Sequence, residues 1–148
     1  MTAPSSKAVR ATQVGHEAMT SVAGKAIAAG TSKGVGVVVI GLSSRAAMVA
    51  NAVGGQTELA SILAVNKSQP SHWIKGTERP NPSNARILVD LDHVIARIQL
   101  LWAPSMVTPW LKASNAFLDG ARPIDVLRVE GTRRVIEALD AEASGAFA

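Results

Sequence analysis

Apolar residues recur every three or four positions over much of the chain, which is the spacing of one face of an α-helix. The clearest stretch runs over residues 85–102 and is stopped by Pro104. Its apolar positions are Ile87, Leu88, Leu91, Val94, Ile95, Ile98, Leu101 and Trp102. A shorter stretch begins after Ser43 or Ser44, either of which would serve as the N-cap, and stops at Gly54. The pattern therefore predicts an all-α fold.

Two short helices are predicted next, over residues 56–63 and about 68–75, with a tight turn at Ala64 and Val65 and Gly76 closing the second. In the second helix the apolar side comprises Pro70, Trp73 and Ile74, and the polar side comprises Ser68, Ser71, His72 and Lys75. The apolar side must pack inward. The polar side offers the groups that read base edges and contact phosphates. Such a pair is typical of a helix-turn-helix, with a solvated helical hairpin as the alternative.

The C-terminal part carries a second helical unit. Pro123 suits a first helical turn, and Gly131 with Thr132 separates one apolar run from the next. The pattern predicts two short helices followed by a tail that contains Phe147. Such a tail either folds back onto its own core or offers an apolar plug to a partner.

Composition removes several classes of site. The 148 residues are 47% apolar, enough for one modest core or two small helical ones, and we expect two subdomains. The chain has no cysteine, so it has no disulfide or thiolate metal site, which fits a reducing cytoplasm. His16, His72 and His93 stand far apart, so we expect neither a metal nor any other cofactor.

Charge divides unevenly along the chain. Residues 1–50 hold five cations against one carboxylate and residues 51–86 hold four against two, while the remainder holds six against eight. The net charges of the three parts are therefore +4, +2 and −2. This asymmetry suits an N-terminal half that binds a polyanion and a C-terminal part that binds protein. A basic segment can also simply be solvated.

The N-terminal part shows no targeting segment. Polar residues interrupt the apolar ones up to Ala29, so no signal peptide is evident, and the run over residues 35–40 is too short to span a bilayer. We expect a cytoplasmic protein with no membrane contact, a mobile arm over about residues 1–13, a weak helix over 13–29 and a β-prone run over 37–40. The glycine-rich stretch 30–36 lacks the order G-x-x-x-x-G-K-[ST] of a phosphate loop.

An enzyme function is not expected. Asp90 and Asp92 reproduce the apolar-D-x-D spacing of phosphotransferases related to haloacid dehalogenases, whose two aspartates must share one substrate. The apolar period around them is helical, however. Side chains two positions apart on a helix point in directions about 200° apart, so the two aspartates could not share one substrate. No other nucleophile with a neighbouring base is apparent.

The last quarter of the chain carries a distinctive set of residues: Trp110-Leu111, Asn115, Leu118, Gly120, Arg122-Pro123, Asp125, Leu127, Gly131, Val135, Leu139 and residues 145–148. In these positions the segment resembles the C-terminal toxin-binding domain of the Xre/MbcA/ParS family of antitoxins. The resemblance implies a RES-domain toxin that degrades NAD as partner, with the tail helping to occlude its active site. It also implies toxin-binding residues, which we take to be Trp110, Asn115, Arg122, Arg134, Gly145, Ala146, Phe147 and Ala148.

The two short helices resemble the Xre-type helix-turn-helix at Gln56, Leu59-Ala60, Leu63, Trp73, Gly76 and Pro80. By position, Lys67, Ser68 and His72 look like base-reading residues and Gln56 looks like a phosphate contact. Lys75 and Arg79 would add electrostatic attraction. The complete predicted DNA-binding set is Gln56, Lys67, Ser68, Gln69, Ser71, His72, Lys75 and Arg79.

Together these features predict a four-part chain. The parts are an N-terminal arm (1–41), a helix-turn-helix domain (42–86), a connecting helix (87–103) and a toxin-binding domain with its tail (104–148). We expect an antitoxin that occludes a RES-domain toxin and represses its own operon by binding operator DNA, as a homodimer or in a higher toxin–antitoxin assembly. The alternative is a free-standing DNA-binding regulator, for example one carried by a phage, whose C-terminal domain oligomerises.

Overall fold

The computed structural model describes residues 40–145. The predicted N-terminal arm, apart from Ile40 and Gly41, lies outside the described residues, and so do the weak helix at 13–29 and most of the β-prone run. The tail residues Ala146, Phe147 and Ala148 also lie outside them.

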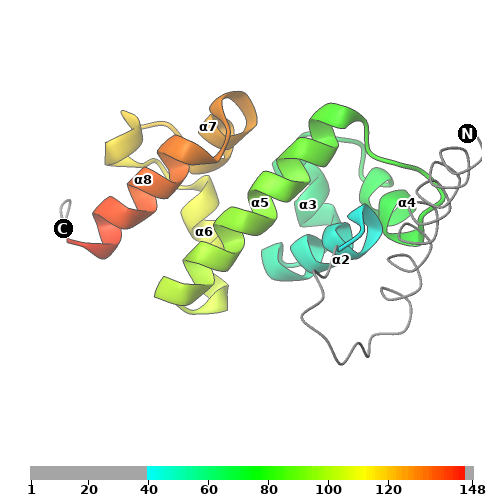
Figure 1. Ribbon diagram of the computed structural model, residues 1–148, viewed down its shortest axis with the longest axis horizontal. Coiled ribbons are helices and arrows are strands. Elements are labelled where there is room, and N and C mark those ends of the chain that lie inside the picture. Colours follow the sequence, from blue (N-terminus) through cyan, green and yellow to red (C-terminus); the bar gives the residue numbers. More distant parts are fainter. Residues whose placement is uncertain (1–39, 146–148) are drawn as a thin grey trace, which may run out of the picture. The chain divides into compact units, whose positions relative to one another are not determined.

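Within residues 40–145 the chain forms helices and turns and no strand, which confirms the all-α prediction (Figure 1). The elements are α2 (Leu42–Val53), α3 (Gln56–Leu63), α4 (Gln69–Lys75), α5 (Pro82–Leu101), the 3-10 turn η1 (Pro104–Met106), α6 (Val107–Lys112), the 3-10 turn η2 (Ala116–Leu118), α7 (Pro123–Glu130) and α8 (Thr132–Ala143).

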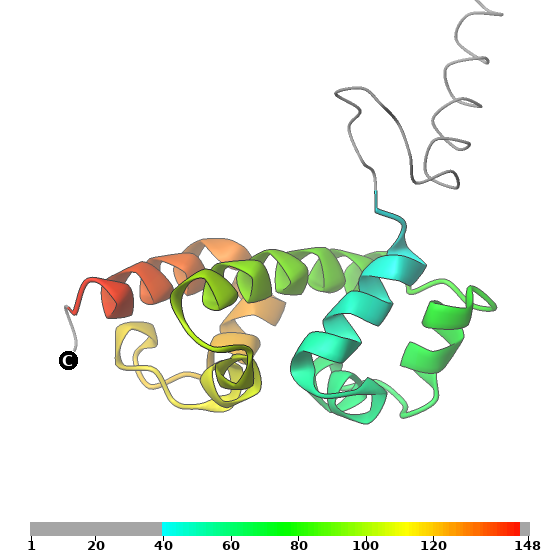
Figure 2. The same ribbon diagram turned by 90° about the horizontal axis from the view of Figure 1, so that it is seen from below.

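The long helix α5 is the element on which the others assemble. Helices α2, α3 and α4 lie on one side of α5, and α6, α7 and α8 lie on the other (Figures 1 and 2). Its buried residues are Ile87, Leu88, Leu91, Val94, Ile95 and Ile98, which are six of the eight predicted apolar positions, whereas Leu101 is exposed and Trp102 is half-buried. Because buried residues run without interruption from Ala46 in α2 to Leu139 in α8, the two sides share one core.

Glycines end three of the helices where the sequence predicts it. Gly54 and Gly76 follow α2 and α4 with φ of 103° and 73°, a left-handed conformation that costs glycine little. Gly131, with φ 88° and ψ −162°, ends α7 and begins α8. The predicted breaks at these glycines are therefore confirmed.

Two predicted helix starts are wrong. Helix α2 begins at Leu42 with Gly41 as its N-cap, so neither Ser43 nor Ser44 caps it. Helix α5 begins at Pro82, three residues before the predicted start, because the side chain of Asn81 accepts the Asn84 N–H at 2.8 Å and proline fits a first turn.

Helix α4 begins at Gln69, close to the predicted start near residue 68. Ser68 occupies the N-cap position, but its backbone is already helical and its side chain makes no capping bond. Its hydroxyl donates instead to Oδ1 of Asn66 at 3.3 Å. The short helices η1, α6 and η2, between Pro104 and Leu118, were not predicted, because none is long enough to show an apolar period.

Candidate functional site

The first candidate surface is built by α3 and α4. Leu59, Ile62 and Leu63 of α3 and Trp73 of α4 are buried, so both helices are fixed through their apolar sides. Ala64 joins them in a left-handed conformation with φ 54°. This geometry turns the polar side of α4 outward, as the sequence predicts.

The predicted DNA-binding residues are mostly exposed. Gln56, Lys67, Ser68, His72, Lys75 and Arg79 are exposed, while Gln69 and Ser71 are half-buried. The His72 ring is held near α4, since its Nδ1 lies 3.3 Å from Oγ1 of Thr77, and the Gln69 amide donates to Glu78 at 3.4 Å. Ser68, His72 and Lys75 lie three or four residues apart and therefore share one face of the helix. Gln56 starts α3, and Arg79 follows α4.

This surface also collects positive charge that no carboxylate within residues 40–145 pairs with. Within residues 40–145, seven cations form ion pairs with carboxylates: Arg45, Arg86, Arg97, Lys112, Arg122, Arg133 and Arg134. The cations of this range without such a partner are Lys67, Lys75, Arg79 and Arg128. Three of these four lie in or beside α4, where a polyanion would find them available.

The second candidate surface centres on the C-terminal helices, where two predicted contact residues are interior. Trp110 is 7% exposed and Asn115 is 5% exposed. The Trp110 indole donates its N–H to Oε2 of Glu142 at 2.9 Å, and the Asn115 amide donates to Oε1 of the same carboxylate. The Trp110 ring also packs against Trp102, with centroids 6.4 Å apart.

Asn115 further organises the turn that contains η2. Its side-chain oxygen accepts the Leu118 N–H, and its backbone carbonyl accepts the N–H groups of Leu118 and Gly120. Its own N–H donates to the Ala121 carbonyl at 3.1 Å. Trp110 and Asn115 therefore support the C-terminal unit from inside.

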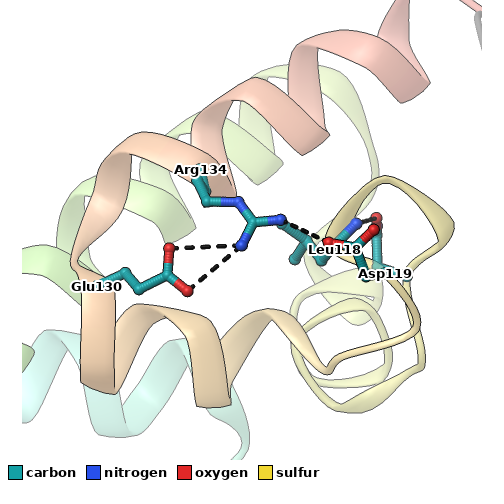
Figure 3. Close-up of polar contacts among 5 residues, drawn as sticks. Leu118, Asp119, Glu130 and Arg134 are labelled. Atoms are coloured by element: carbon teal, nitrogen blue, oxygen red, sulfur yellow. Dashed lines mark hydrogen bonds and ion pairs between the residues drawn. The ribbon is translucent and has the colours of Figure 1, made fainter.

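Arg122 and Arg134 lie nearer the surface and pair with carboxylates: Arg122 within the start of α7, and Arg134 with groups on two other segments. Arg122 makes two hydrogen bonds to Asp125, of 2.6 and 2.9 Å. Arg134 of α8 lies between Glu130 at the end of α7 and Asp119, whose Oδ2 is 3.0 Å from its guanidinium (Figure 3). The hydrogen bond to Asp125 raises the pKa of Arg122, and the one to Asp119 is the main cause that raises the pKa of Arg134.

The remaining predicted contacts lie at the end of the described chain. Gly145 is exposed, has φ 71° and donates its N–H to the Glu142 carbonyl at 3.0 Å. Ala146, Phe147 and Ala148 follow it outside the described residues, so their part in binding stays a prediction.

Sequence reasoning missed the residues that link the elements. Glu142 joins α8 to Trp110 and Asn115, which lie 32 and 27 positions earlier in the chain. Thr108 donates to the Val53 carbonyl at 2.7 Å, and Lys112 pairs with Glu58, so α6 is tied to α2 and α3. No local pattern could reveal these contacts, because each joins residues far apart in sequence.

The described residues offer no other kind of centre. None of the histidine, aspartate and glutamate side chains in residues 40–145 gather in threes as metal ligands. Asp90 and Asp92 pair separately, with Arg86 and Arg45. No helix in the same range combines the length and hydropathy that a bilayer crossing requires.

The C-terminal helices match a known protein domain. Residues 103–145 match the model of the antitoxin Xre/MbcA/ParS C-terminal toxin-binding domain. A protein of Mycobacterium tuberculosis named "Probable mycobacterial cidal antitoxin Rv3188" is 28% identical over 92 residues, which are 62% of this chain and 78% of that protein. The mycobacterial cidal antitoxin MbcA of Mycobacterium bovis is 25% identical over 90 residues, covering 61% of this chain and 80% of MbcA.

A solved structure shares the fold. The match is to the crystal structure of the M. tuberculosis MbcT–MbcA toxin–antitoxin complex, with a TM-score of 0.61 and 23% identity over 74% of this chain and all of that chain. The helices of residues 103–145 thus coincide with a defined toxin-binding domain, and the full-length relatives are antitoxins. Residues 103–145 therefore match the toxin-binding domain of the Xre/MbcA/ParS antitoxins, and the chain is similar to MbcA antitoxins over about three fifths of its length.

Proposed function

We propose that this chain neutralises a RES-domain toxin that degrades NAD, by occluding the toxin's active site in a stoichiometric complex and without turnover of its own. The observation that carries the proposal is the match of residues 103–145 to a toxin-binding domain, and the relatives named as antitoxins support it. The activity belongs in the cytoplasm, where NAD and the operon are both present.

The contact surface must be broader than the tail. Burial of Phe147 contributes about 2 kcal/mol at most before the cost of ordering the segment, which cannot supply tight binding alone. Arg122, Arg134 and Gly145 are the candidates on the described surface that contact the toxin directly, together with Ala146–Ala148. Trp110 and Asn115 act from the interior by holding that surface in shape.

The α3–α4 unit gives the chain a second activity, repression of its own operon. Lys67, Lys75 and Arg79, which have no carboxylate partner within residues 40–145, support this proposal, since such cations can neutralise DNA phosphates and displace the counterions condensed on them. We expect the chain to bind operator DNA as a homodimer or within a larger toxin–antitoxin assembly, because two-fold symmetric binding lets each copy read one half-site.

The test begins with the gene beside this one: the proposal expects it to encode a RES-domain protein, and the two proteins are then co-expressed. Rescue of growth, a stable complex on purification and loss of NAD consumption when the two proteins are mixed are the expected results. If the chain binds the operator and oligomerises but leaves NAD consumption unchanged, it is a free-standing regulator and the proposal is wrong.

A further inference from the structure

Glu142 has an environment unlike that of most carboxylates in the described chain. One of its oxygens accepts the Trp110 indole N–H and the other accepts the Asn115 side-chain N–H. No cation pairs with it within residues 40–145, whereas Asp125, Glu130 and Asp140 each pair with an arginine. Its negative charge is thus matched by two neutral donors that are themselves buried.

The position of Glu142 within α8 makes this arrangement unexpected. It lies in the last turn, where the negative end of the helix dipole disfavours a carboxylate, and that turn contains no basic residue. Its hydrogen bonds must therefore outweigh the unfavourable dipole. Bonds to a charged acceptor are about twice as strong as neutral ones, which makes the carboxylate an effective link between α8, α6 and the start of η2.

The same turn leads directly to the predicted tail. The Glu142 carbonyl accepts the Gly145 N–H at 3.0 Å, and the Ser144 hydroxyl donates to the Ala141 carbonyl at 2.9 Å. Gly145 can turn the chain because it has φ 71°. The side chain of Glu142 thus fixes the turn, and the backbone of the turn fixes where the chain leaves α8.

We infer that Glu142 is a positioning residue for toxin binding: its carboxylate, held by Trp110 and Asn115, sets the direction in which the chain leaves α8 at Gly145. This inference rests on the proposed function. It predicts that geometry at Glu142 controls affinity for the toxin even where folding is preserved, since a tail that leaves in many directions must be ordered before it binds.

The experiment moves the negative charge from Glu142 to its hydrogen-bond partner Asn115. Glu142→Gln keeps the shape but sets a side-chain N–H against the Asn115 N–H. Adding Asn115→Asp restores complementarity, because the new carboxylate can accept from the new amide while its other oxygen keeps the Leu118 N–H. Glu137→Gln is the matched control, since Glu137 lies on the same helix in an exposed pair with Arg133.

Three quantities are measured on the full chain: affinity for the adjacent RES-domain protein, the chemical shift of the Trp110 indole N–H, and fast backbone motion at Gly145. We expect Glu142→Gln to weaken affinity about tenfold or more, to shift the indole signal and to increase motion at Gly145. The double variant should recover all three, and Glu137→Gln should change none.

Unchanged affinity and unchanged Gly145 motion in Glu142→Gln would overturn the inference. So would a double variant that recovers thermal stability without recovering affinity, because the role of Glu142 would then be structural only. If the unaltered chain does not bind the RES-domain protein, the proposed function fails. The motion at Gly145 then decides separately whether Glu142 sets the path of the chain.

Discussion

At the scale of single residues, Trp102 and Trp110 show how similar side chains acquire different roles. Their rings are neighbours, 6.4 Å apart and tilted by 38°. Trp110 is buried and donates to Glu142, whereas Trp102 is half-buried and its indole N–H has no partner among the described residues. Losing the Trp110 N–H would leave a partly buried carboxylate oxygen without its donor.

Trp110→Phe is therefore expected to lower the free energy of unfolding by about 1–3 kcal/mol, the usual cost of an unsatisfied buried polar group. Trp102→Phe is the control and should cost less, because it removes no hydrogen bond. Urea unfolding followed by circular dichroism compares the two variants. Equal losses would mean that the bond to Glu142 contributes nothing specific.

The backbone conformation at Gly131 is by itself enough to require glycine at this position. Its φ of 88° and ψ of −162° fall in a region that only glycine adopts readily. The space around it is ordinary, since an added Cβ would lie 3.6 Å from the Arg86 guanidinium. Any cost of substitution would therefore arise from strain and not from a clash.

We expect Gly131→Ala to destabilise the protein by about 1–3 kcal/mol. Gly41→Ala is the matched comparison, because Gly41 has φ −65° and nothing within 4 Å of an added Cβ, and it should cost less than about 1 kcal/mol. Denaturation curves of the two variants, read against the parent chain, test this difference. If Gly131→Ala left the free energy of unfolding unchanged, the backbone between α7 and α8 would have relaxed to accommodate alanine.

At the scale of elements, the helices that were predicted best are those with a long apolar period or a terminal glycine. Helix α3 matches its predicted bounds, and α4 ends where Gly76 requires it. The start of α5 was missed because its cap, Asn81, precedes the apolar residues that reveal the helix. Ends with left-handed glycines are visible in a sequence, whereas caps that depend on one side-chain bond are harder to recognise.

The candidate site residues also fall into two groups, those whose orientation could be predicted from the sequence and those whose orientation could not. Helical spacing and residue type were enough to predict the outward side of α4, because orientation within one helix follows from local geometry. The interior positions of Trp110 and Asn115 were not predictable, since they follow from packing and from hydrogen bonds to Glu142, which lies on a helix far along the chain. A family pattern marks which residues matter but not whether they face a partner or the core.

The exposed lysines in and beside helix α4 give a prediction about operator binding. Replacing Lys67 and Lys75 with alanine should weaken operator binding and reduce the slope of log affinity against log salt by about one for each phosphate that the protein no longer neutralises. Arg133→Ala is the control, since Arg133 is 90% exposed but lies on α8 and pairs with Glu137. A double variant with the parent slope would remove Lys67 and Lys75 from the DNA-binding surface.

At the scale of the whole molecule, both sides of α5 share a single core. Trp73 reports on one side, and Trp102 and Trp110 report on the other. Because the buried residues on the two sides of α5 form one continuous core, we expect residues 41–145 to unfold in one cooperative transition. A chain with Trp73→Phe and a chain with Trp102→Phe and Trp110→Phe should each give fluorescence transitions that coincide with its own circular dichroism. Separate transitions would instead show two independent subdomains.

The link from α6 to α2 and α3 has a consequence for any cut of the chain. A fragment that stops near residue 103 loses Thr108 and Lys112, which leaves the Val53 carbonyl and the Glu58 carboxylate without their partners and uncovers the far side of α5. Such a fragment should not reproduce operator binding by the intact chain. Under the proposed function, a protease that clips the C-terminal half in a cell would release the toxin and end repression of the operon in the same event.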